Sequence, residues 1–69
     1  MNKKVINLKV STGYKQHRMT WESRAVTRQE LARFLVKVAK SDDWEDKLLV
    51  ERRQAYFQGK VYCWCYNGQ

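Results

Sequence analysis

Residues 27–40 have the sequence TRQELARFLVKVAK, which contains the clearest secondary-structure signal of this 69-residue chain. Thr27 is followed three residues later by Glu30, which is the spacing of a capping box at the start of a helix. Apolar residues then recur at helical spacing and form a stripe along one side: Leu31, Phe34, Leu35, Val38 and Ala39. The sequence therefore predicts an amphipathic helix over about 28–40, whose apolar side needs a packing partner.

Two segments before this helix alternate between apolar and polar residues, as half-buried strands do. The first covers residues 3–10, with Ile6, Leu8 and Val10 on one face. The second covers about 18–25. The loop 11–17 contains Gly13 and is expected to join the two strands as a hairpin.

The segment after the helix allows two interpretations. Trp44 and the acidic residues around it could begin a second helix, but the apolar residues of 48–50 and 56–57 favour a strand at about 47–57. Gln58-Gly59 is typical of a hairpin turn and leads into a last strand over 60–66. The order is then β-β-α-β-β. It predicts a single small α+β domain over residues 1–69, with one helix packed on one face of an antiparallel sheet.

Size and composition restrict the class of protein. A chain of 69 residues with 43% apolar and 13% aromatic residues can form one small core, with little room for a deep substrate cleft. The sequence contains no Gly-rich phosphate loop, nucleophile elbow or metalloprotease motif. Cys63, Cys65 and His17 are too few ligands for a structural zinc site. We therefore expect no enzymatic activity, no catalytic residues, no metal and no cofactor.

The expected cellular location follows from the apolar runs and the cysteines. No uninterrupted apolar run reaches the length of a signal-peptide core or of a membrane-spanning helix. The two cysteines lie two positions apart on one strand and do not suggest a disulfide framework. We expect a cytoplasmic protein with reduced thiols and no membrane partner.

The uneven distribution of charge is the main indication of function. Residues 1–40 contain ten Lys and Arg residues against two acids, a net charge of +8, while residues 41–69 have a net charge of −1. Clustered cations bind phosphates by releasing condensed counterions, although a charged helix side is also commonly just solvated. The basic residues that we expect to bind nucleic acid are Arg18, Arg24, Arg28, Arg33, Lys37, Lys40 and Arg53, with Lys3, Lys4, Lys9 and Lys15 adding to them.

The last strand carries two rows of side chains on opposite faces: a small row of Val61, Cys63 and Cys65, and an aromatic row of Tyr62, Trp64 and Tyr66. One helix can cover only one sheet face, and the small row suits the covered face. The aromatic row would then stand on the open face beside Arg52 or Arg53, where its rings could stack on nucleobases or anchor a protein. In the alternative interpretation, the aromatic row forms the core.

Two functional hypotheses follow from the charge and the aromatic row. The first is a small non-enzymatic protein that binds DNA or RNA through its basic surface, with stacking by the aromatic row. The second is a protein-binding inhibitor or adaptor, of the kind found among small bacterial and phage accessory proteins, that anchors an acidic partner through exposed aromatics. A homodimer is possible in either case.

Overall fold

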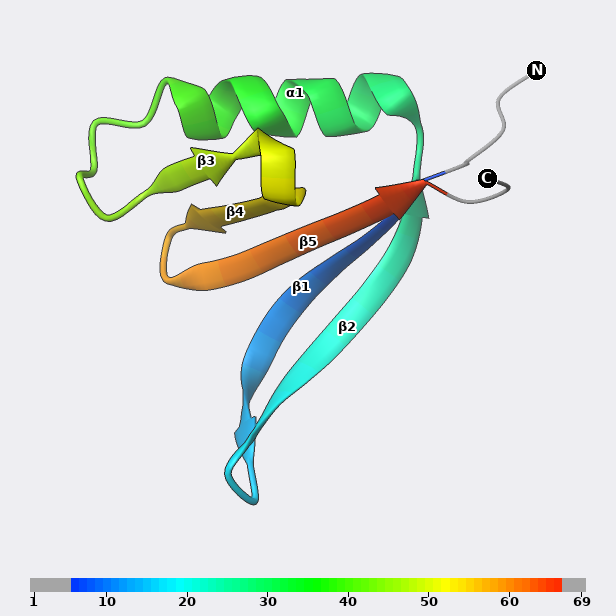
Figure 1. Cartoon of the computed structure of the whole chain (residues 1–69), viewed down its shortest axis with the longest axis vertical. Helices are drawn as coiled ribbons and strands as arrows, with labels where there is room; N and C mark the ends of the chain where they lie inside the picture. The colour runs from blue at the N-terminus through cyan, green and yellow to red at the C-terminus, as the bar shows by residue number, and fades with distance from the viewer. Residues whose placement is uncertain (1–5, 67–69) are drawn as a thin grey trace.

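The computed structural model describes residues 6–66, in which five strands form one antiparallel sheet and one α-helix covers part of one sheet face (Figure 1). The elements are β1 (Ile6–Lys15), β2 (Arg18–Val26), α1 (Arg28–Ala39), β3 (Lys47–Leu49), β4 (Gln54–Phe57) and β5 (Lys60–Tyr66). The strand order across the sheet is β2-β1-β5-β4-β3. The predicted α+β class, with one helix on an antiparallel sheet, is confirmed. Residues 3–5 of the first predicted strand lie outside the described residues.

Helix α1 begins as its sequence predicts. The amide of Glu30 donates to Thr27 Oγ1 at 3.1 Å, and the amide of Thr27 donates to Glu30 Oε1 at 2.9 Å, which completes the capping box. The helix ends at Ala39, one residue before the predicted end, and Lys40 caps it. Leu31 and Val38 are buried, and Phe34 and Leu35 pack against the core, so the predicted apolar stripe faces the sheet except for Ala39, which is exposed.

The connection between β1 and β2 is much shorter than the predicted loop 11–17. Strand β1 continues to Lys15, and only Gln16 and His17 form the turn, both with positive φ (53° and 66°) as in a type I′ hairpin. Gly13 lies inside the strand, at φ 146°, where the register with β2 shifts between Ser11 and Gly13. The glycine therefore marks a β-bulge and not the turn, which is why the sequence suggested a loop.

The predicted strand 47–57 is also divided. β3 ends at Leu49, a 3₁₀ turn covers Val50–Arg52, and Arg53 adopts a left-handed conformation (φ 54°) before β4 begins. The second helix considered near Trp44 is not formed by residues 41–46. That loop is held by Asp46, which accepts hydrogen bonds from Ser41 Oγ (2.5 Å) and the amide of Gln58 (3.0 Å).

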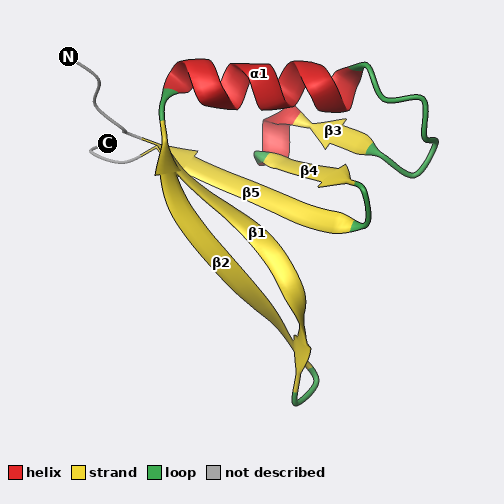
Figure 2. Cartoon of the chain, turned by 180° about the vertical axis from the view of Figure 1, so that it is seen from behind, coloured by secondary structure: helices red, strands yellow, loops and turns green. Residues whose placement is uncertain are grey.

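The core lies between α1 and the sheet. Its buried residues are Ile6, Leu8, Val26, Leu31, Val38, Ala55 and Trp64. Phe34 of α1 packs against Phe57 and Tyr62, with ring centroids 5.9 and 4.5 Å apart. The helix lies above the β3–β4–β5 side, and the far part of the β1–β2 hairpin extends away from it (Figures 1 and 2). We call this far part, residues 11–22, the hairpin arm.

Candidate nucleic-acid interface

The aromatic row of β5 faces the helix, so its predicted place on the open face is wrong. Trp64 is 5% exposed, and Tyr62 and Tyr66 pack against the core cluster while remaining partly exposed. Strand pairing explains this placement: Ile6 lies opposite Tyr66 and Leu8 opposite Trp64, and directly opposed residues share a sheet face. The alternative interpretation of the row as core is correct, because large rings bury more apolar area than the small row does.

The open face of the sheet consists of the other set of alternating side chains. Tracing the pairing from the small row across all five strands gives its members: Asn7, Lys9, Ser11, Tyr14, Met19, Trp21, Ser23, Ala25, Lys47, Leu49, Gln54, Tyr56, Val61, Cys63 and Cys65. No described helix covers this set (Figures 1 and 2). It is a broad surface on which three rings are exposed.

Those three rings come from different strands. Trp21 of β2 is 43% exposed, Tyr56 of β4 is 40% exposed, and Tyr14 in the arm is 75% exposed. On one side of the sheet Trp21 pairs with Ser11, and on the other Tyr56 pairs with Val61. The two pairs are joined by a hydrogen bond of 2.8 Å from the Val61 amide to the Ser11 hydroxyl. Trp21 and Tyr56 therefore lie in one row across the sheet, separated by β1 and β5.

The charge on the open face is entirely positive. Lys9 and Lys47 belong to it, and none of its strand residues is Asp or Glu. Glu22, the one acidic residue within the described strands, is opposite Val10 and therefore on the helix side. An anion approaching this face meets lysines and rings without a carboxylate in the strands to repel it.

None of the seven predicted basic residues belongs to the open face of the sheet. Arg33 and Lys37 are exposed on α1, and Lys40 is exposed at its C-cap. Arg28 and Arg53 both lie at Tyr66, with guanidinium carbons 5.8 and 5.0 Å from its ring centroid, so each makes a cation–π contact. This also shows that Arg53 contacts the aromatic row. The N-terminal Lys3 and Lys4 lie outside the described residues.

The two remaining predicted cations, Arg18 and Arg24, lie on β2 with side chains on the helix side of the sheet, opposite Lys15 and Leu8. Arg24 lines a shallow cavity of about 390 Å³ that also contains Glu22 and Lys60. The carboxylate of Glu22 offsets part of the positive charge there.

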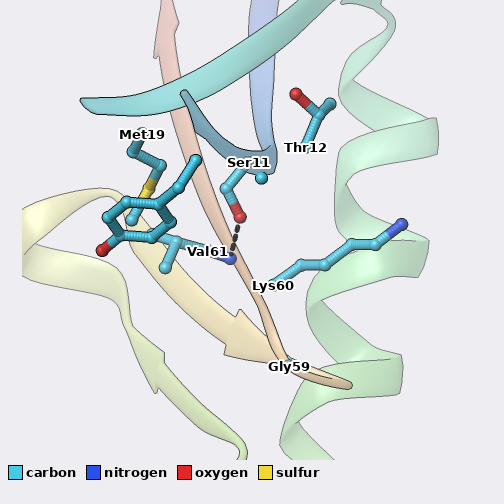
Figure 3. A pocket seen from close by; sticks show the side chains of 8 residues that line it. Ser11, Thr12, Met19, Gly59, Lys60 and Val61 are labelled. Carbon is cyan, nitrogen blue, oxygen red and sulfur yellow. Dashed lines mark hydrogen bonds between the residues drawn. The ribbon is translucent and has the colours of Figure 1, made fainter. Parts of the chain in front are cut away.

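A second cavity lies where β1 separates from β5. The β1–β5 pairing covers Ile6–Val10, after which β1 continues with β2 alone. The Ser11 hydroxyl closes the fork by accepting from the Val61 amide (Figure 3). A cavity of about 310 Å³ remains between the strands, lined by Ser11, Thr12, Gly13, Tyr14, Met19, Gly59, Lys60 and Val61. We call it the fork cavity.

Other kinds of site have less support in residues 6–66. Cys63 and Cys65 are free thiols on the open face. This part of the chain contains no group of three or more His, Cys, Asp and Glu side chains that could hold a metal ion. It also contains no helix that is long and apolar enough to cross a membrane.

No protein family model, curated protein or solved structure matches this chain significantly. The function must therefore be inferred from the chain's own residues. Sequence reasoning missed Trp21, Tyr56 and Tyr14 as exposed rings. For Trp21 and Met19 the signal was present, because the alternation over 18–25 places them on one face, but it does not say which face the helix covers.

Proposed function

We propose that this protein binds single-stranded nucleic acid on the open face of its sheet. The observation that carries the proposal is an acid-free sheet face that exposes Trp21 and Tyr56 together with Lys9 and Lys47. Exposed rings on a sheet surface stack on unpaired bases of any sequence, and nearby cations hold the backbone. The overall charge of +7 favours a polyanion as the ligand.

The spacing of the two rings suits contacts to separate nucleotides. Trp21 and Tyr56 are three strand positions apart, which at ~4.8 Å per paired strand is at least about 14 Å, because their row crosses the fork where β1 no longer pairs with β5. Stacked nucleotides of one strand are ~3.4 Å apart, so this distance corresponds to at least about four base steps. The two rings would therefore stack on different bases of the same strand, and each contact should be worth ~1–3 kcal/mol.

The backbone contacts predict a salt dependence. Each phosphate neutralised on a single strand contributes about −0.7 to the slope of log K against log salt, so Lys9 and Lys47 together contribute about −1.4. The exposed cations of α1 point away from the open face and add to the long-range field. They should affect the association rate more than the contacts themselves.

The test is a titration of labelled single-stranded DNA and RNA, and of duplex DNA, at several salt concentrations. Trp21→Ala is expected to weaken single-strand binding about 5- to 150-fold, which is the stated stacking energy converted at 1.4 kcal/mol per factor of ten. Trp44→Ala is the matched control, because this 82% exposed ring lies in the loop before β3, off the sheet. Millimolar or weaker binding of every nucleic acid at low salt would refute the proposal.

A second candidate is an inhibitor or adaptor that binds an acidic protein. The observation in its favour is the row of small apolar residues, Val61, Cys63 and Cys65, in the middle of the open face, since a protein surface could pack against it. Co-purification of one stoichiometric protein after nuclease treatment, and its loss on Trp21→Ala, would favour this candidate.

A further inference from the structure

We propose that the fork cavity receives one unpaired nucleobase, inserted between the arm and the start of β5. This inference rests on the proposed function. It adds that binding requires a base that can leave the stack of its neighbouring bases on the strand. The cavity volume of about 310 Å³ is large for a water site and small for a folded partner. A nucleobase carries no charge, so the apolar lining of the cavity makes it a suitable occupant, while the positive charge of the protein attracts the phosphates of the same strand.

The walls of the fork cavity supply the contacts that a base needs. The cavity is lined by the ring of Tyr14, the thioether of Met19 and the isopropyl group of Val61, all of which belong to the open face. Figure 3 shows Met19 and Val61 on the same side of the fork. A flat apolar wall with an aromatic ring and a polarisable sulfur is suited to the face of a base.

The polar boundary of the cavity supplies orientation and charge. The bulge at Gly13 interrupts the regular β1–β2 register beside the cavity, and the Gly13 carbonyl accepts a hydrogen bond from Thr20 Oγ1 at 3.1 Å. Lys60 forms the opposite rim, and its side chain extends away from Met19 (Figure 3). By strand pairing Lys60 belongs to the helix side of the sheet, so a phosphate reaches this ammonium only if the strand crosses the fork from the open face to the helix side.

The shape of the cavity depends on the bulge and on one hydrogen bond. Bulges bend and twist a strand, and here the bend separates the arm from β5 just beyond Val10. The Ser11–Val61 hydrogen bond of 2.8 Å fixes the point at which the fork opens. The cavity is therefore held open by the fold in the absence of ligand, so insertion of a base does not require the strands to separate.

The test is a double-mutant cycle between the protein and the strand. The probes are an oligothymidylate and the same backbone with abasic sites throughout, each titrated with the native protein, Tyr14→Ala and Tyr14→Phe. Tyr14→Ala is expected to weaken binding of the oligothymidylate at least 5-fold and to leave the abasic strand unchanged, while Tyr14→Phe binds both like the native protein. Tyr14 is 75% exposed, so these variants should keep their melting temperatures.

A second variant distinguishes insertion from stacking on the surface. Val61→Phe fills the cavity and adds a ring to a half-buried position of the open face. If a base enters the cavity, this variant should weaken oligothymidylate binding as Tyr14→Ala does. Two results would overturn the insertion and leave the open-face proposal intact. One is unchanged or tighter oligothymidylate binding by Val61→Phe. The other is an equal loss of affinity for the oligothymidylate and the abasic strand in Tyr14→Ala. Failure of the native protein to bind either strand would overturn both.

Discussion

Replacing Trp64 by alanine should remove most of the stability of this protein. The side chain is 5% exposed and lies among the core residues beneath α1, opposite Leu8. Truncation of a buried Phe or Trp to Ala typically costs ~3–5 kcal/mol, because apolar contacts are lost and a cavity remains. At ~0.05–0.15 kcal/mol per residue, the whole chain of 69 residues is stable by only about 3–10 kcal/mol. The loss is therefore comparable to the total.

The assay is urea and thermal unfolding followed by far-UV circular dichroism, with Trp21→Ala as the matched control. For a domain of this size, 1 kcal/mol lowers the melting temperature by ~4–8 °C, so Trp64→Ala should melt at least about 12 °C lower or be unfolded at room temperature. Trp21 is 43% exposed and its truncation should cost clearly less. Equal or smaller destabilisation by Trp64→Ala would refute the placement of the aromatic row in the core and return it to the open face.

Three further substitutions test local features of the fold by the same melting assay. Thr27→Ala removes one half of the capping box and should cost ~1 kcal/mol, a fall of several degrees; no change would mean that the cap contributes nothing. Ser11→Ala leaves the Val61 amide without its acceptor and should cost ~1–3 kcal/mol, whereas an unchanged melting temperature would show that water replaces the hydroxyl. Replacing Gln16-His17 by Asn-Gly should raise the melting temperature, because both positions have positive φ that these residues adopt more readily, and a decrease would contradict the type I′ assignment.

The elements with strong local signals could be predicted from the sequence. The capping box and apolar stripe located α1 to within one residue, and the alternation over 60–66 located β5. The turn of β1–β2 and the division of 47–57 could not be predicted. Each depends on non-glycine residues with positive φ, Gln16, His17 and Arg53, which tertiary structure imposes against their preference.

The candidate interface was predicted less well than the fold. Period-two alternation separates the two faces of β5 but does not say which face a helix will cover, and this decides whether Trp64 or Cys65 is exposed. Counting charges had a similar limit, because it identifies cations but not their neighbours. It did not show that Arg28 and Arg53 meet at Tyr66. Nor did it show that Lys9 and Lys47 share a sheet face without acidic strand residues. Strand pairing and the packing of α1 on the sheet supply this information.

The projection of the hairpin arm beyond α1 has a consequence for local dynamics. A two-stranded ribbon is barely stable by itself, so amide hydrogens of residues 12–21 should exchange with solvent through small openings that leave Ile6–Val10 protected. A ligand that binds to Tyr14 or Trp21 would suppress those openings. Slower exchange confined to the arm would then map where the ligand lies, residue by residue, without any substitution in the protein.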